Sequence, residues 1–138
     1  MATRVPALAF FDTNVLLYLV SSDAAKADCA ESLLARGGVI SVQVLNEFAN
    51  AGRRKAKLEW AEIVDILALI RRQCRVVDVT EAVHDRGMAV IQRHALSVYD
   101  AMIVSAALEA GADTLYSEDM QPGLRIERAL TIVNPFLP

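Results

Sequence analysis

The sequence predicts an α/β fold, a three-layer α/β/α sandwich built around a central parallel sheet. Short apolar runs alternate with longer segments of helical periodicity along the whole chain. At 138 residues the chain can bury a hydrophobic core of its own, and we expect one domain over residues 1–138. Apolar residues make up 54% of it, which favours a compact, helix-rich protein and excludes a disordered one.

The first half of the chain predicts short buried strands separated by helices. Ser41 is a typical N-cap, while Gly37-Gly38 and Gly52 are placed to stop two helices. The predicted elements are a strand over residues 7–11, helices over 15–20 and 24–36, a strand over 39–40, a helix from 41 to about 51, and an amphipathic helix over 59–73.

The second half of the chain continues the alternation. Thr80 is a typical N-cap, and Gly111 is placed to end the last helix. The predicted elements are strands over residues 76–79, 114–116 and 130–133, and helices from 80 to about 94 and over 97–110. Ligands of parallel sheets bind beyond the carboxyl ends of the strands. The residues that follow each strand are therefore the first candidates for a functional site.

Composition excludes two classes of protein. No run of 18 apolar residues lacks a charge, so we expect no membrane span, and no signal peptide is recognised at the N-terminus. Cys29 and Cys74 form no metal-binding or redox motif and are expected to be reduced and buried. The sequence therefore predicts a cytoplasmic protein with no membrane association.

Two acidic positions follow predicted strands directly. Asp12 closes the first strand and precedes Thr13 and Asn14, and an acidic stretch over residues 117–119 follows the strand over 114–116. If those strands are neighbours, both acids face the same crevice. Asp12 is equally suited to cap a helix, and the later stretch is equally typical of a polar loop.

Two further acids lie on predicted helices. Glu47 falls on a polar face near Gln43 and Asn50, where a solvated glutamate is the simpler interpretation. Asp100 stands in the first turn of a helix that is apolar on almost every side, so its carboxylate needs a partner or a cation. Ser97 and Asp100 also have the spacing of a capping box, which is compatible with metal binding.

Carboxylates gathered in one crevice would repel one another, and a divalent cation removes that penalty. Hard oxygen ligands without clustered histidine or cysteine favour Mg²⁺ or Mn²⁺ over zinc. Such an ion activates a bound water and stabilises charge on phosphorus, so the predicted chemistry is phosphodiester hydrolysis. The candidate catalytic and metal-binding residues are Asp12, Glu47, Asp100 and Asp119.

A basic cluster follows the Glu47 helix. Its members are Arg53, Arg54, Lys55 and Lys57. The chain carries a net charge of −3, so contact with nucleic acid would need a local patch of this kind. The cluster is a candidate RNA-binding surface for the phosphate backbone, and a solvated surface patch is an equal interpretation.

Four segments in this order resemble the PIN-domain nucleases, most closely the VapC-like toxins of bacterial toxin–antitoxin pairs. The resemblance runs from about residue 9 to residue 135, and the order of the motifs makes the set specific. The segments are Phe11-Asp12-Thr13-Asn14, Asn46-Glu47-Phe48, the stretch 99–107 that begins Tyr99-Asp100-Ala101, and the stretch 113–119 that ends Ser117-Glu118-Asp119. The sequence departs from the family after Asp119, where Met120-Gln121-Pro122 replaces a frequent aromatic residue.

The resemblance implies a PIN-like fold in which Asp12, Glu47, Asp100 and Asp119 bind Mg²⁺ or Mn²⁺. Three polar residues would support that site: Asn14, Ser117 and Thr13. It further implies an endoribonuclease that cuts a structured RNA such as tRNA or rRNA and inhibits translation. It also implies a homodimer and a cognate antitoxin protein that blocks the site. The neighbouring Glu118 leaves the identity of the fourth acid open.

Three other functions are compatible with parts of this sequence. A housekeeping RNA-processing nuclease of the same fold would share the chemistry, and an adjacent antitoxin gene would separate the two. A phosphatase with an aspartyl nucleophile needs an acid where Asn14 stands. A non-catalytic, flavodoxin-like receiver module needs a lysine late in the chain, and none follows Lys57. The sequence therefore favours the nuclease.

Overall fold

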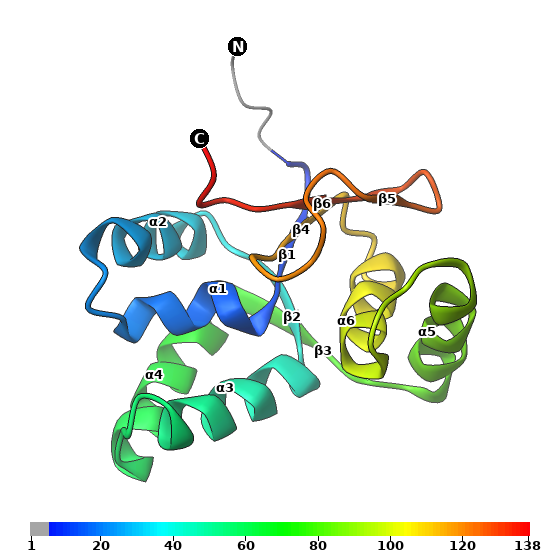
Figure 1. The fold of residues 1–138 in the computed structure, drawn as a ribbon. Coiled ribbons are helices and arrows are strands. Elements are labelled where there is room, and N and C mark those ends of the chain that lie inside the picture. Colours follow the sequence, from blue (N-terminus) through cyan, green and yellow to red (C-terminus); the bar gives the residue numbers. More distant parts are fainter. Residues whose placement is uncertain (1–5) are drawn as a thin grey trace.

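The computed structural model describes residues 6–138, which form a six-stranded sheet covered by helices (Figure 1). The strands are β1 (Ala9–Phe11), β2 (Gly38–Ser41), β3 (Cys74–Val77), β4 (Thr114–Tyr116), β5 (Arg125–Ile126) and β6 (Leu130–Val133). The helices are α1 (Thr13–Leu17), the 3-10 turn η1 (Tyr18–Val20), α2 (Ala24–Ala35), α3 (Val42–Arg54), α4 (Trp60–Gln73), α5 (Glu81–Arg93) and α6 (Val98–Glu109).

The sheet has the strand order β3-β2-β1-β4-β6-β5, with β1 in its interior. β1 is parallel to β2 on one side and to β4 on the other, with Phe10 opposite Val39 and Leu115. The predicted parallel sheet is thus correct except for β5, which pairs antiparallel with β6 and was not predicted. A strand of two residues is too short to show a period of two, so the sequence carries no signal for it.

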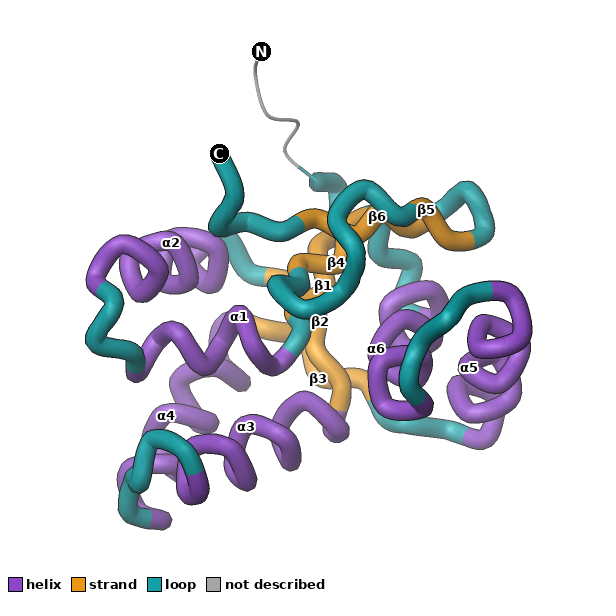
Figure 2. Tube along the Cα trace, viewed as in Figure 1, coloured by secondary structure: helices purple, strands orange, loops and turns teal. Residues whose placement is uncertain are grey.

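Helices cover both faces of the sheet, which confirms the three-layer sandwich. α1, α2, α3 and α4 lie on one side of the strands, and α5 and α6 lie on the other (Figures 1 and 2). Residues 101–108 of α6 are all buried because this helix contacts both the sheet at β2 and the outer helix α5. Its apolar character on every side, visible in the sequence, follows from that position.

Two predicted boundaries are wrong. Gly52 does not end α3, which continues to Arg54; it lies buried against α4, and a Cβ there would lie 3.6 Å from Cγ1 of Ile63. That distance is an ordinary van der Waals contact, so the packing leaves room for a methyl group, and Gly52 is an interior residue of α3 and not its end. The predicted strand over residues 76–79 lies two positions earlier, because Cys74–Val77 is the stretch that pairs with β2.

Two adjacent glycines shape the entry into β2. Gly37 ends the preceding helix region with a φ of +77°, a conformation that favours glycine, and this confirms the predicted stop. Gly38 lies so close to β1 that a Cβ would be 2.7 Å from the Ala9 carbonyl oxygen and 2.7 Å from Cε2 of Phe11. The missing side chain therefore permits the pairing of β1 with β2.

Helix caps bring polar residues to the carboxyl edge of the sheet. Asp12 follows β1 and caps α1, and Ser41 ends β2 and caps α3. Thr80 and Ser97 cap α5 and α6, as predicted from their types and positions. Since β1 and β2 are parallel, α1 and α3 both begin at the same edge.

Candidate active site

Asp12 is the most buried acid of the candidate site, with 4% of its surface exposed. Its Oδ1 accepts a hydrogen bond from the backbone N–H of Thr13 at 2.7 Å. Its Oδ2 accepts from the Ser117 hydroxyl at 2.8 Å and from the Asn14 side-chain amide at 3.1 Å. The three residues predicted to support the site therefore all contact Asp12, and they hold its carboxylate in one orientation.

The electrostatic state of Asp12 is unusual for an aspartate. Burial raises its pKa to about 6, although the hydrogen bonds from Ser117 and Thr13 oppose the increase. The negative charges of Asp100 and Glu47 raise the pKa further. Asp12 is thus a buried carboxylate whose acidic neighbours disfavour its charge, and a bound cation would relieve this condition.

Ser117 is a buried residue at the end of β4 that links Asp12 to the following loop. Its hydroxyl donates to Asp12 and accepts a hydrogen bond from the Met120 backbone N–H at 3.2 Å. Its own backbone N–H donates to the Val133 carbonyl at 3.0 Å. The side chain therefore uses both its donor and its acceptor capacity inside the protein.

Asp119 is exposed in the loop after β4, and Asn14 connects it to Asp12. The Asn14 amide nitrogen lies 3.2 Å from Oδ2 of Asp119, in addition to its contact with Asp12. The Asn14 amide oxygen accepts from the Glu118 backbone N–H at 3.0 Å. One side chain thus fixes the β4 loop against the start of α1.

Glu118 does not share the position of its neighbour Asp119. Its carboxylate accepts from the Tyr18 hydroxyl at 2.6 Å and pairs with Nζ of Lys26 at 2.8 Å. Burial alone would raise the pKa of Glu118, but the hydrogen bonds from Lys26 and Tyr18 lower it below its usual value. These contacts occupy both carboxylate oxygens, which makes Asp119 the acid of this loop that is available to a ligand.

Glu47 is partly buried and is oriented by two hydrogen bonds. Oε1 accepts from the Thr13 hydroxyl at 2.7 Å, and Oε2 accepts from the side-chain amide of Gln43 at 3.4 Å. Thr13 thereby contacts Asp12 through its backbone and Glu47 through its side chain. The interpretation of Glu47 as an ordinary solvated glutamate is therefore wrong, because its carboxylate faces the start of α1.

Asp100 occupies the first turn of α6 and is partly buried. Its backbone N–H donates to the Ser97 hydroxyl at 3.2 Å, so the predicted cap on this helix is formed. Burial raises the pKa of Asp100 above its usual value, Ser97 opposes the increase, and the charge of Asp119 adds to it. Asp100 therefore lies within electrostatic range of the acid on the β4 loop.

The four acids approach the carboxyl edge of the sheet from four separate segments. The charges of Asp100 and Glu47 help to raise the pKa of Asp12, and the charge of Asp119 helps to raise the pKa of Asp100. Within residues 6–138, however, no three acidic, histidine or cysteine side chains are close enough to hold one ion together. Two features account for this separation. The carboxylates repel one another, and the Asn14 amide lies between those of Asp12 and Asp119.

The side chains fit a hard divalent cation by their chemistry. Every candidate ligand is a carboxylate oxygen, the donor that Mg²⁺ and Mn²⁺ prefer. Burial and, to a smaller extent, the charges of Asp100 and Glu47 raise the pKa of Asp12, and a bound cation would offset the cost of its ionised form. Mg²⁺ uses only some protein ligands and keeps several waters, so it does not require all four acids in direct contact.

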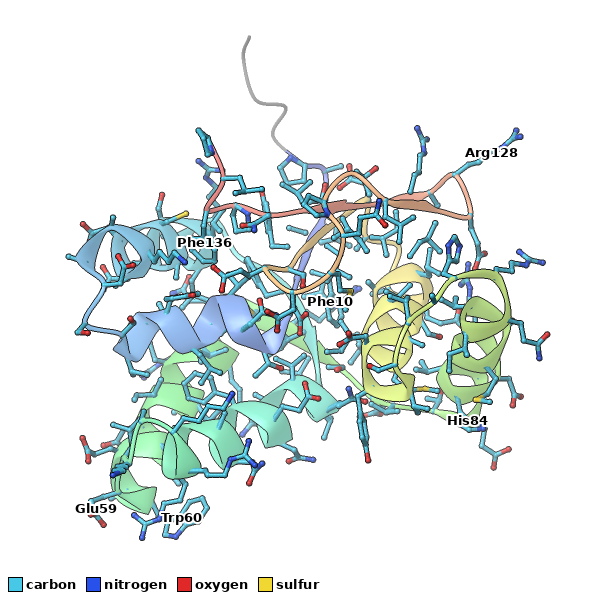
Figure 3. The ribbon with its side chains drawn as sticks, in the orientation of Figure 1. Phe10, Glu59, Trp60, His84, Arg128 and Phe136 are labelled. Carbon is cyan, nitrogen blue, oxygen red and sulfur yellow. The ribbon has the colours of Figure 1, made fainter. Side chains whose placement is uncertain are left out.

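The predicted basic cluster lies at the outer end of α3. Arg53, Arg54, Lys55 and Lys57 are all exposed. Arg53 donates to the Leu58 carbonyl at 3.0 Å and lies over the ring of Trp60 at 5.5 Å. Figure 3 places Trp60 far from Phe10 of the central sheet. Arg54 is seven positions beyond Glu47, about 10 Å along the helix axis, so the cluster is separate from the acids.

Three contributing residues were not predicted from the sequence. Gln43 contacts Glu47, while Tyr18 and Lys26 hold Glu118. Gln43 stands one helical turn before Glu47, and this spacing does place the two on one polar face in the sequence, but it gives Gln43 no role in the site. Tyr18 and Lys26 are about 100 positions from Glu118, and no local sequence pattern predicts their contact with it.

The fold and the side chains together define an α/β/α domain with an acidic site at the carboxyl edge of a mostly parallel sheet. A family model described as PIN domain matches residues 9–122. This chain belongs to the PIN domain family, which confirms the resemblance drawn from the four sequence segments.

Several solved structures share this fold. VapC20 of Mycobacterium tuberculosis, described as a sarcin-ricin loop cleaving toxin, is 22% identical with a TM-score of 0.66, over 80% of this chain and 89% of that one. A toxin–antitoxin complex from Klebsiella pneumoniae is 19% identical with a TM-score of 0.69, over 93% and 98%. VapBC2 from Rickettsia felis, bound to a promoter DNA fragment, is 17% identical with a TM-score of 0.68, over 92% and 99%. No curated protein sequence gave a significant match.

The helices carry no sign of a membrane span. Within residues 6–138, none combines the length and the apolar character that crossing a bilayer requires.

Proposed function

We propose that this protein is a Mg²⁺- or Mn²⁺-dependent endoribonuclease, the toxin of a toxin–antitoxin pair, which inhibits translation by hydrolysing RNA. The observation that carries the proposal is the buried Asp12 carboxylate, held by three donors and surrounded by other acids. Membership of the PIN domain family and the VapC-like fold support it. The proposed catalytic and metal-binding residues are Asp12, Glu47, Asp100 and Asp119.

The proposed roles follow from the position of each side chain. Asp12 is the fixed anchor, because Thr13, Asn14 and Ser117 hold both of its oxygens. Asp119 is exposed and so lies on the side from which RNA would enter. A divalent cation, when bound, supplies an activated water and stabilises charge at the phosphorus. The carboxylates would hold this cation at the point where the negatively charged phosphodiester must approach.

The proposed partners are RNA and proteins of the same cell compartment. We place the protein in the cytoplasm, with a tRNA or rRNA as substrate and a cognate antitoxin as inhibitor. The similar structures include toxin–antitoxin complexes, which supports the antitoxin. We further propose a homodimer, which light scattering of the purified protein would measure. A protein that remains a monomer at micromolar concentration would contradict this part of the proposal.

RNA cleavage by the purified, partner-free protein is the direct test. Total cellular RNA is incubated with the protein and Mg²⁺ or Mn²⁺, and parallel samples contain EDTA or the Asp100→Asn variant. Asp65→Asn is the matched control, because Asp65 is an exposed carboxylate on α4 outside the site. We expect discrete fragments with wild type and with Asp65→Asn, and none in the other two samples.

Mapping the fragment ends would identify the RNA that is cut. Fragments that persist in EDTA would contradict the metal dependence. Fragments that persist with Asp100→Asn would contradict the assignment of that residue. The absence of cleavage by folded wild-type protein in either metal would contradict the nuclease itself.

A further inference from the structure

We infer that Gln43 is a positioning residue that sets the gap between Glu47 and Asp100, and thereby the affinity of the site for a divalent cation. This inference rests on the proposed metal-dependent function and names a residue that neither the motifs nor the four acids include. The side-chain amide of Gln43 donates to the Tyr99 backbone carbonyl at 3.0 Å and to Oε2 of Glu47 at 3.4 Å.

The two helices that Gln43 connects belong to different layers of the sandwich. α3 lies on one side of the sheet and α6 on the other, and their first turns meet at the carboxyl edge (Figure 1). Gln43 stands in the first turn of α3, and Tyr99 stands in the first turn of α6. The amide therefore spans the opening between the layers.

Gln43 also completes a continuous path of hydrogen bonds. Thr13 donates to Asp12 through its backbone and to Glu47 through its hydroxyl. Gln43 continues the path from Glu47 to the carbonyl of Tyr99. Asp12 at the start of α1 and the acids on α3 and α6 are thus positioned relative to one another by two intervening residues, Thr13 and Gln43.

The backbone at the α6 end of this path is itself held in place. Asp100 follows Tyr99 directly, and its N–H donates to the Ser97 hydroxyl. A shift of the Tyr99 carbonyl relative to α3 would therefore move the first turn of α6 together with Asp100. Without Gln43, Glu47 would keep its bond to Thr13 at 2.7 Å, but the distance from Glu47 to Asp100 would no longer be set.

The residue type matters at this position. An amide nitrogen donates two hydrogen bonds, and both partners of Gln43, a carboxylate and a carbonyl, are acceptors. Glutamate has no donor and would add a negative charge beside Glu47. Asparagine keeps the amide but is one methylene shorter. Alanine removes the bridge without adding charge.

Mn²⁺ binding measured by isothermal titration calorimetry is the test, with wild type and the variants Gln43→Ala and Gln43→Asn. The control is Asn50→Ala, an exposed amide on the same helix. We expect Gln43→Ala to bind Mn²⁺ about fivefold more weakly because, of its two lost hydrogen bonds, the one to Glu47 orients a proposed metal ligand. We expect Asn50→Ala to bind as wild type, and the melting temperature in EDTA to be nearly equal for both alanine variants.

RNA cleavage gives a second readout that a merely structural role would not produce. At limiting Mn²⁺ we expect Gln43→Ala to cleave more slowly than wild type, and at saturating Mn²⁺ we expect its rate to recover. Gln43→Asn should fall short of wild type in both measurements, because its amide is one methylene too short to reach both partners.

Unchanged Mn²⁺ affinity in folded Gln43→Ala would overturn the inference, and so would an equal loss of affinity in Asn50→Ala. If Gln43→Ala fails to fold, the uncharged variant Gln43→Asn decides by the same criterion. Failure of the proposed function has a different signature: wild type binds Mn²⁺ and Gln43 variants bind it more weakly, yet no RNA is cleaved. That result would leave the role of Gln43 intact.

Discussion

The Asp12→Asn variant should be more stable than wild type in the absence of metal at neutral pH. The pKa of Asp12 in the folded protein is about 6, compared with an ordinary value of 3.8. Because the folded pKa is raised, the protonated carboxyl favours folding, and this stability is lost as the pH rises through 6. Asparagine is neutral throughout this range and avoids the loss.

The expected magnitude follows from the pKa and the hydrogen bonds. About two pH units separate the two pKa values, and each unit corresponds to about 1.4 kcal/mol, so ionised Asp12 costs about 3 kcal/mol above pH 7. Asparagine cannot accept from Thr13, Ser117 and Asn14 together, and we assign about 1 kcal/mol to the lost bond. The variant should therefore gain about 2 kcal/mol at pH 7.5 and lose about 1 kcal/mol below pH 4.

Urea unfolding of metal-free protein across this pH range is the assay. Wild type should have the larger free energy of unfolding below pH 4 and the variant the larger one at pH 7.5, so the two values should be equal at an intermediate pH. Adding Mn²⁺ at pH 7.5 should reverse their order, because only wild type gains the free energy of binding. A difference that does not vary with pH, or a wild type that is the more stable protein in EDTA at pH 7.5, would refute the reasoning.

Three further variants test other contacts. Ser117→Ala removes a buried donor to Asp12 and the acceptor of Met120, and should lower the free energy of unfolding by about 2 kcal/mol in urea; a loss below about 0.5 kcal/mol would show that the bond contributes little. Gly38→Ala forces a Cβ to within 2.7 Å of the Ala9 carbonyl and should cost about 3 kcal/mol, whereas Gly111→Ala, which has open space and a φ of +79°, should cost about 1 kcal/mol; equal losses would contradict the clash. Glu118→Gln should retain Mn²⁺ affinity and cleavage, while Asp119→Asn should lose cleavage; the opposite result would exchange the roles of the two acids.

Local signals account for what the sequence predicted correctly. Asp12, Ser41, Thr80 and Ser97 each occupy a helix start, and the chemistry of a cap depends only on neighbouring residues. The buried helix α6 is recognisable because its apolar residues occur on every side. The position of Asp12 after a buried strand is equally local, so the candidate site could be located before the structure was known.

Contacts between distant segments account for what the sequence could not predict. Gly52 is a typical residue for a helix end, but α3 continues past it to Arg54, and its contact with Ile63 of α4 cannot be read from the local sequence. Glu118 and Asp119 are adjacent acids of the same loop, and contacts of Glu118 with Tyr18 and Lys26, about 100 positions away, distinguish them. The hydrogen bond from Gln43 to Tyr99 spans 56 positions and ends on a backbone carbonyl. Every residue has such a carbonyl, so the identity of residue 99 does not predict the contact.

The position of β1 between β2 and β4 has a consequence for the time at which the site arises. Asp12 is made early, but Ser117 and Asn14 connect it to a loop that lies more than 100 positions later. A chain still being translated therefore lacks the donor that orients its buried carboxylate, as well as the exposed Asp119. The acidic centre can therefore be assembled only after residues 117–119 have been made, so a nascent chain that ends before the β4 loop holds Asp12 without Ser117 and without Asp119.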